Sequence, residues 1–178
     1  MDLTGDLGTY IEHDGRPAVR FVRTYAHPIE RVWTAITDPA ELVRWFPSAV
    51  TLEPRVGGSV RFSEDPYTDG GTGTVLAYEP PRRFSFVWFT DELHLTLDPV
   101  DDGNCRLTLV NVLADRTTAA RNAGGWYVCL AELAKLVDGV PSRGPHSDDT
   151  EPWEPVYEAH VRAGVPSGAE VPDIAGTS

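Results

Sequence analysis

Residues 116–138 read RTTAARNAGGWYVCLAELAKLVD and form the longest helical pattern of the chain. Apolar residues recur there at alternating intervals of four and three, which is the period of one continuous helix face. This stripe consists of Ala119, Ala123, Trp126, Leu130, Leu133 and Val137. Gly139 follows, where a glycine commonly ends a helix. Gly124 and Gly125 each cost about 1 kcal/mol inside a helix, so the pair predicts a close approach of the helix backbone to the sheet, or a kink.

The residues before this helix form short β-prone runs, many of them alternating apolar with polar positions, which is typical of antiparallel strands. Outward from the helix, the expected strands are 105–113, 93–97, 83–90, 72–78, 59–63 and 50–53. Near the start of the chain, Asp14-Gly15 separates two further β-prone runs, 8–12 and 18–26, and predicts a hairpin.

Two short helices are expected between the hairpin and the later strands. The first carries one apolar face made of Ile29, Val32, Trp33 and Ile36. Asp38-Pro39 ends it, because the residue before a proline avoids the helical conformation. Asp38 then caps a second helix that carries Leu42, Trp45 and Phe46. The order of elements predicts an α+β fold, with a curved antiparallel sheet of about six to seven strands around the long C-terminal helix.

The chain divides into a domain over residues 1–140 and an extension over residues 141–178. The extension is rich in Pro, Gly, Ser and Asp. Apolar residues in 153–162 predict a short helix that docks on the domain. Small and polar residues with prolines predict disorder from Gly164 to Ser178.

Composition excludes several classes of function. The 178 residues carry a formal net charge of −12, which argues against nucleic-acid and anionic-membrane partners. No run reaches the roughly 18 apolar residues of a membrane span, and residues 1–7 lack the pattern of a signal peptide. We therefore expect a cytoplasmic protein, in which Cys105 and Cys129 stay reduced. The sequence contains no metal-ligand cluster and no phosphate-binding loop, so no metal and no cofactor are expected.

Several short sequence motifs resemble those of the START-like superfamily, also called SRPBCC or helix-grip. The closest resemblance is to the branch named for homologues of the heat-shock-protein-90 ATPase activator. The residues that carry it are HPIERVWTA (27–35), DPAELVRWF (38–46), VGGSVRF (56–62), GTV (73–75), PPRRFSFVW (80–88) and GWYVCL (125–130). The resemblance spans roughly residues 8 to 140. It implies a sheet that grips the C-terminal helix, with a cavity between them, but it does not imply one chemistry.

The candidate ligand-contacting residues are the large side chains expected near that cavity. They are Trp45, Phe46, Phe62, Phe84, Phe86, Trp88, Asn111, Trp126 and Tyr127. Apolar pockets with a few polar groups are the usual sites for small molecules. For each residue the alternative is an ordinary place in the core, and for Asn111 it is a structural hydrogen bond.

The sequence is consistent with three functions. The leading hypothesis is a protein that binds a hydrophobic or aromatic small molecule without catalysis. An enzyme of the polyketide cyclase or dehydratase type would need an acid–base pair in the cavity, for which His94, Tyr127 and Tyr67 are the candidates. If Leu93 and Leu95 face inward, however, His94 faces solvent. A co-chaperone that stimulates a chaperone ATPase follows from the resemblance alone.

Overall fold

The computed structural model describes residues 6–171, and its main element is an antiparallel sheet in the order β1-β2-β8-β7-β6-β5-β4-β3. The strands are β1 (Thr9–His13), β2 (Arg16–Tyr25), β3 (Ala49–Leu52), β4 (Ser59–Ser63), β5 (Gly71–Glu79), β6 (Arg83–Trp88), β7 (Asp91–Asp101) and β8 (Asn104–Val112). The sheet therefore has 8 strands, more than the six to seven expected, because the short outer strands β1 and β3 both pair into it.

The β1–β2 hairpin forms where the sequence predicted it. Asp14 and Gly15 have φ angles of 50° and 78°. Two consecutive positive φ angles are what a two-residue turn of type I′ requires, and this turn matches the twist of the flanking strands.

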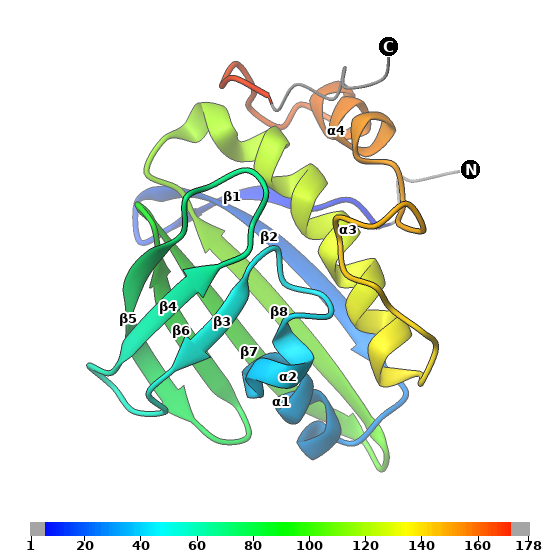
Figure 1. Cartoon of the computed structure of the whole chain (residues 1–178). Helices are drawn as coiled ribbons and strands as arrows, with labels where there is room; N and C mark the ends of the chain where they lie inside the picture. Colours follow the sequence, from blue (N-terminus) through cyan, green and yellow to red (C-terminus); the bar gives the residue numbers. More distant parts are fainter. Residues whose placement is uncertain (1–5, 172–178) are drawn as a thin grey trace.

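Two short helices, α1 (Ile29–Thr37) and α2 (Pro39–Leu42), follow β2. The side chain of Asp38 accepts a hydrogen bond of 2.9 Å from the backbone N–H of Ala40, which confirms the predicted cap. The indole Nε1 of Trp45 donates to the carbonyl of Ala35 at 2.9 Å. This bond ties the segment after α2 to α1, and the two helices lie beside the C-terminal end of α3 (Figure 1).

The long helix α3 (Ala119–Val137) crosses the concave face of the sheet, and a single 3-10 turn, η1 (Arg116–Thr118), precedes it (Figure 1). All residues of the predicted apolar stripe are buried. Gly139 has φ 72° and lies just beyond the helix, as predicted. The glycine pair plays a different part from the one expected. A side chain at Gly124 would meet Trp153 at 2.9 Å, so the close approach there is to the extension and not to the sheet.

The extension packs back onto α3 through helix α4 (Trp153–Arg162). Disorder from Gly164 onward is wrong for residues 164–171. The carbonyl of Pro166 accepts from Ala120 N at 2.8 Å, and Val165 is buried. The N-terminal turn of α3 leaves backbone N–H groups without intrahelical partners, and this segment supplies an acceptor. Residues 1–5 and 172–178, on which the signal-peptide and disorder predictions partly rest, lie outside the described residues.

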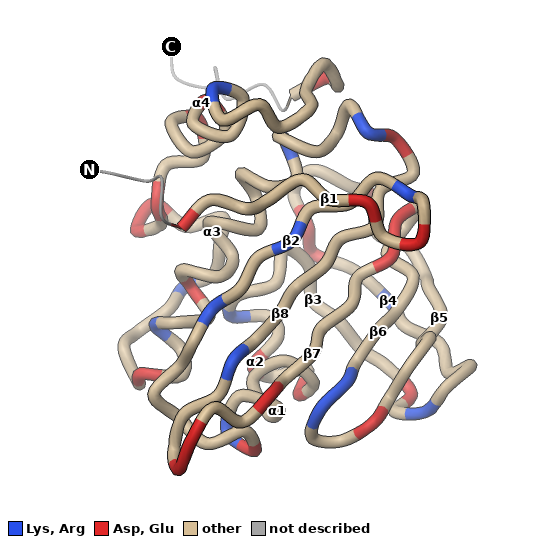
Figure 2. The backbone as a smooth tube through the Cα atoms, turned by 180° about the vertical axis from the view of Figure 1, so that it is seen from behind, with Lys and Arg blue, Asp and Glu red and all other residues tan. Residues whose placement is uncertain are grey.

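The two faces of the sheet differ in character. Along β2, Val19, Phe21 and Tyr25 are buried against α3, while Arg20 and Val22 point to the other side and are exposed. Figure 2 shows that outer side, where basic and acidic residues are spread over the strands. Within residues 6–171, no helix combines the length and the apolar character needed to cross a membrane.

Candidate functional site

An aromatic cluster fills the space between the concave face of the sheet, the segment after α2 and helix α3. It is the candidate site, and we define it as Phe46, Phe62, Phe86, Trp88, Phe89 and Trp126. The period of two along β6 brings Phe84, Phe86 and Trp88 to the concave face. Phe84 continues the cluster into the core, with its ring 4.9 Å from that of Phe86.

Phe46 lies at the centre of this cluster. Its ring centroid is 5.6 Å from that of Trp126, 6.0 Å from that of Trp88 and 6.4 Å from that of Phe62. These separations lie in the range of favourable edge and offset contacts between aromatic rings. Phe46 is 2% exposed and Trp45 is fully buried. Both predicted contact residues therefore belong to the packed interior, and Trp45 is further held by its hydrogen bond to α1.

Phe89 belongs to this cluster, although the sequence analysis did not include it. Strict alternation along residues 83–90 would direct it outward. It has φ 55°, however, a left-handed conformation that costs a bulky residue about 1 to 3 kcal/mol. Its ring lies 5.6 Å from that of Phe62. A side chain at Gly71 would meet the Phe89 ring at 2.9 Å. The glycine at the start of β5 was the only signal for this placement.

Trp88 carries the one unusual polar group of the cluster. Its Nε1 is buried and has no hydrogen-bond partner among residues 6–171. Trp126, whose ring lies 5.1 Å from that of Trp88, donates instead to Asn111 at 3.0 Å. A buried donor without an acceptor costs about 1 to 3 kcal/mol. Trp88 and Phe89 are both half-buried, so the cluster reaches the surface at the β6–β7 turn.

Asn111 lies at the centre of a buried polar network next to the cluster. Its Oδ1 accepts from Trp126 Nε1 and from Asn122 Nδ2, both at 3.0 Å. Its Nδ2 donates to Asp91 Oδ2 at 3.1 Å, and Asp91 Oδ1 accepts from the backbone N–H of Ala114 at 2.9 Å. Both lone pairs of the amide oxygen are therefore occupied. Asn111 links β8, β7 and α3 and fixes the orientation of the Trp126 ring.

His94 lies on the outer face of the sheet, away from the cluster, because Leu93 and Leu95 face inward. Its Nδ1 lies 3.0 Å from Ser85 Oγ, and its Nε2 lies 3.0 Å from Glu92 Oε2. A serine, a histidine and an acid in contact resemble a Ser–His–acid triad, but the two ring nitrogens are exchanged, because in the triad Nε2 faces the serine and Nδ1 the acid. Ser85 is only 2% exposed, however, so its hydroxyl is closed to a substrate from solvent.

Arg16 completes the group around His94. It binds Glu92 at 2.8 Å, and this hydrogen bond is the main reason why the pKa of Glu92 is lowered, with a smaller contribution from His94. The group is therefore an ion pair of Arg16 and Glu92 on the outer surface of the sheet, with His94 beside it.

The two tyrosines proposed with His94 lie elsewhere. Tyr67 is 65% exposed and its ring contacts that of His146 at 5.6 Å. Tyr127 lies on α3, half-buried, and Arg23 stands over its ring at 5.9 Å. The structure therefore does not bring the candidate acid–base residues together.

Both cysteines are buried free thiols. Burial raises the pKa of Cys105 and of Cys129, so both remain protonated at neutral pH. A protonated buried thiol is a poor nucleophile.

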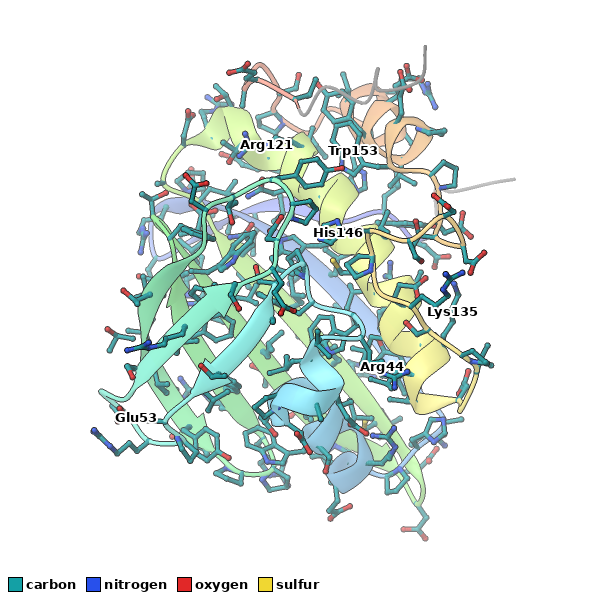
Figure 3. The ribbon with its side chains drawn as sticks, viewed as in Figure 1. Arg44, Glu53, Arg121, Lys135, His146 and Trp153 are labelled. Carbon is teal, nitrogen blue, oxygen red and sulfur yellow. The ribbon has the colours of Figure 1, made fainter. Side chains whose placement is uncertain are left out.

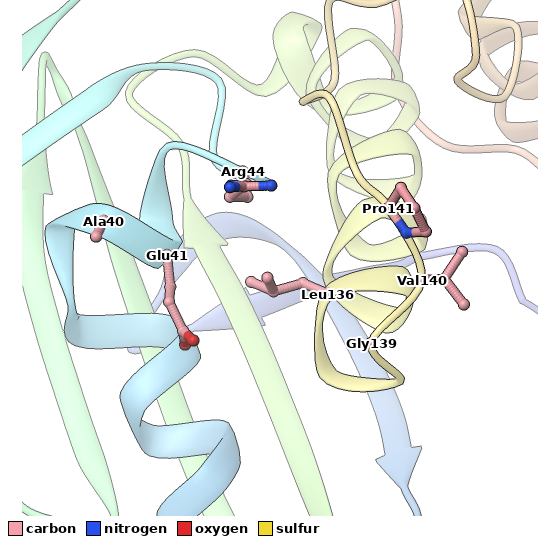
Figure 4. Close-up of a pocket in the computed structure, with 7 residues that line it drawn as sticks. All are labelled: Ala40, Glu41, Arg44, Leu136, Gly139, Val140 and Pro141. Carbon is pink, nitrogen blue, oxygen red and sulfur yellow. The ribbon is translucent and has the colours of Figure 1, made fainter.

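Two surface hollows flank the C-terminal half of α3. The first, of about 410 Å³, lies between α2 and the end of α3 (Figure 4). Its charged groups already have partners, because Glu41 binds Arg31 at 2.8 Å and Arg44 donates to the carbonyl of Ser142 at 3.4 Å. The second, of about 430 Å³, lies between β2 and α3.

Comparison with known families shows to which family the chain belongs. The profile of the family described as "Activator of Hsp90 ATPase homolog 1-like protein" matches residues 26–138. The chain belongs to this family. The matched residues run from just after β2 to just after α3, so they include the whole aromatic cluster and Asn111. In this member of the activator of Hsp90 ATPase homolog 1-like family, the extension after residue 138 lies outside the match.

Solved structures confirm the helix-grip fold of this family member. A conserved protein of unknown function from Enterococcus faecalis is 18% identical with a TM-score of 0.70, over 88% of this chain and 89% of that one. The solution structure of CalU16 from Micromonospora echinospora is 23% identical with a TM-score of 0.67, over 89% and 93%. A Bordetella parapertussis protein is 24% identical with a TM-score of 0.63, over 89% of each chain. No curated protein matches the sequence.

Proposed function

We propose that this protein binds an aromatic or otherwise flat apolar small molecule against the aromatic cluster, without catalysis. The observation that carries the proposal is the buried Trp88 Nε1, which has no acceptor among residues 6–171. A ligand with a carbonyl, ether or hydroxyl oxygen would supply the acceptor and remove the cost of the unpaired donor. The ligand is therefore expected to combine an apolar body with one hydrogen-bond acceptor.

The β6–β7 turn is the proposed point of entry. Trp88 and Phe89 are half-buried there, whereas Phe46, Phe62 and Phe86 behind them are buried. The Phe89 ring lies against Gly71 and is held by a strained backbone, so its displacement opens the cluster while relieving strain. Affinity would come mainly from apolar burial of about 25 cal/mol per Å², offset by the cost of ordering the ligand and the turn.

Binding without catalysis is favoured over a polyketide cyclase or dehydratase activity by the placement of the polar groups. His94 lies on the outer face of the sheet and Tyr67 is exposed. Asn111, which accepts from the cluster residue Trp126, is engaged in structural hydrogen bonds. Location in the cytoplasm is part of the same proposal, and the two free cysteines support it.

A co-chaperone role is the second candidate, and it is favoured by the family match over residues 26–138. An assay of the ATPase activity of heat-shock protein 90 in the presence of the purified chain distinguishes the co-chaperone role from small-molecule binding. A clear increase in ATP turnover, unchanged by Trp88→Phe, would favour the co-chaperone role.

Native mass spectrometry of the freshly purified full chain tests the binding proposal. The expected result is an excess mass that disappears on denaturation. Trp88→Phe keeps an aromatic ring but removes the N–H, so it should retain much less of the bound compound. Trp33→Phe is the matched control, because Trp33 is half-buried against Tyr78 and outside the cluster. Equal retention by both variants would contradict the proposal.

A further inference from the structure

We infer a second binding site, the groove between β2 and α3, for a small molecule that carries a protonated amine on an apolar body. The groove has a volume of about 430 Å³. It is separate from the aromatic cluster and independent of the proposed function. It differs from the hollow beside α2 in having an unpaired polar group in its wall.

Helix geometry separates the two sites. Tyr127, Ala131, Ala134 and Asp138 line the groove and recur at intervals of four, three and four, so they share one face of α3 or of its C-terminal cap. The stripe through Trp126 is displaced by one residue, which is a rotation of about 100° around the helix axis. The aromatic cluster and the groove thus lie on neighbouring faces of α3.

Tyr25 is the unpaired group. It is 6% exposed, it lines the groove, and its hydroxyl has no hydrogen-bond partner within the described part of the chain. Burial raises the pKa of Tyr25 and outweighs the lowering by Arg23, while Asp138 adds a smaller increase, so the hydroxyl stays neutral. Its oxygen can therefore accept a hydrogen bond from a ligand. A buried hydroxyl without a partner is destabilising, and a bound donor would relieve this.

The charges around the groove favour a cation. Asp6, Asp138 and Glu151 line it, against Arg23 as the single basic residue among its lining groups. Asp138 also caps the C-terminus of α3, where the helix dipole favours positive charge. One carboxylate oxygen of Asp138 binds His27 Nε2 at 2.7 Å. An ammonium group placed between the other oxygen and the Tyr25 hydroxyl would satisfy both.

Arg23 does not make the groove an anion site. Its two terminal nitrogens donate to the backbone carbonyls of Asp6, at 2.6 Å, and of Val22, at 3.1 Å. Its guanidinium also lies over the rings of Phe21 and Tyr127, at 5.3 Å and 5.9 Å. These contacts hold Arg23 along the wall. Leu130, Ala131 and Ala134 provide the apolar surface for the body of the ligand.

Titration of the full chain with three probes, followed by two-dimensional ¹H–¹⁵N NMR, tests this inference. The probes are 2-phenylethylamine, 2-phenylethanol and 3-phenylpropanoate, which share the ring and chain but differ in charge. The amine should shift the amides of Tyr25, Tyr127 and Ala134 in a saturable way. The affinity for the alcohol and for the carboxylate should be lower than that for the amine by a factor of about ten or more, which corresponds to the loss of one charged hydrogen bond.

Two variants and a matched control sharpen the test. Tyr25→Phe should lower the affinity for the amine about tenfold, and it should fold normally because the lost hydroxyl has no partner. Asp138→Asn should lower it by a similar factor. Asp98→Asn removes one exposed carboxylate outside the groove and should leave it unchanged. Equal binding of amine and alcohol, shifts centred on Trp88, or an equal effect of Asp98→Asn would each overturn the inference.

Discussion

The hydrogen bonds of the indole N–H groups distinguish buried tryptophans with a structural role from the one that is available to a ligand. The indole N–H groups of Trp45 and Trp126 have protein acceptors, at 2.9 Å and 3.0 Å, while that of Trp88 has none among residues 6–171. The first two rings are thereby fixed in place. Trp88 has its ring in the aromatic cluster and its donor unused, which is the combination expected of a ligand contact.

Asn111 should be far more important for stability than for binding. Asn111→Leu keeps the size of the side chain but leaves Trp126 Nε1 without its acceptor. It also removes one of the two acceptors of Asn122 Nδ2, which keeps its bond to Asp91. The free energy of unfolding should fall by about 2 to 4 kcal/mol, measured by urea denaturation. Asn104→Ala on the same strand removes only an exposed hydrogen bond to Asp101 and should cost less than about 1 kcal/mol. Similar losses in the two variants would show that the network is not structural.

His160 should make stability depend on pH. It is fully buried, its Nδ1 lies 2.8 Å from the carbonyl of Val156, and its Nε2 accepts from Gly8 N at 2.9 Å. Burial lowers its pKa, with a smaller contribution from Arg23. The unfolded chain therefore binds a proton more readily, so the contribution of neutral His160 is complete above the unfolded pKa of about 6.5 and declines as pH falls towards the folded value.

The measurement is the free energy of unfolding between pH 8 and pH 5 for the native chain and for His160→Gln. Glutamine keeps an acceptor but does not titrate. The variant should lose the part of the decline below about pH 6.5 that His160 causes. Identical pH profiles for both proteins would contradict this role.

At the scale of elements, α3 is held on two sides. Its apolar stripe packs on the sheet, and its other side receives α4 through Gly124 and Trp153. Trp153 stacks on Tyr157 at 4.8 Å, and its Nε1 donates to the carbonyl of Arg121 at 3.4 Å (Figure 3). A second attachment lies further along α3. There the Ser142 hydroxyl lies 2.7 Å from Glu132 Oε2, and Lys135 binds Glu132 and the carbonyl of Asp149.

The two glycines of α3 should respond in opposite ways to alanine. Gly125 has open space where a Cβ atom would lie, so Gly125→Ala should stabilise the protein by about 0.5 to 1 kcal/mol through helix propensity. At Gly124 the added atom would lie 2.9 Å from Trp153 Nε1, in a ring already stacked on Tyr157. Gly124→Ala should gain nothing and should increase amide exchange in α4. Equal stabilisation by both substitutions, measured by urea unfolding, would contradict this packing.

For the whole molecule, hydrophobic periodicity accounts for most of the fold. The α3 stripe, the Asp14-Gly15 turn and the Asp38 cap were predictable because each depends on residues close in sequence. The position of Phe89 was not, because a left-handed backbone reverses the side that alternation assigns. The partner of Gly124 and the acceptor at Pro166 come from the extension, far along the chain, and local patterns carry no information about them.

The candidate site was predictable only in part. The sequence identified five of the six cluster residues, and the structure gathers these five around Phe46. It missed Phe89, and the candidate Tyr127 lies outside the cluster, in the groove between β2 and α3. Which indole donor lacks an acceptor depends on angles and distances between elements that lie far apart in the chain. For the same reason, the sequence alone could not predict that the Tyr25 hydroxyl lacks a hydrogen-bond partner.

The NMR signal of the Trp88 indole N–H reports directly on whether a ligand binds at the aromatic cluster. The protein is titrated with 2-acetylnaphthalene, which has a carbonyl acceptor, and with 2-ethylnaphthalene, which has nearly the same shape without it. We predict that the ketone binds more tightly and moves the Trp88 indole proton downfield, as a new hydrogen bond requires, while the Trp45 and Trp126 indole protons move little. An unchanged Trp88 signal at saturation, or equal binding of ketone and hydrocarbon, would show that Trp88 Nε1 is not a ligand contact.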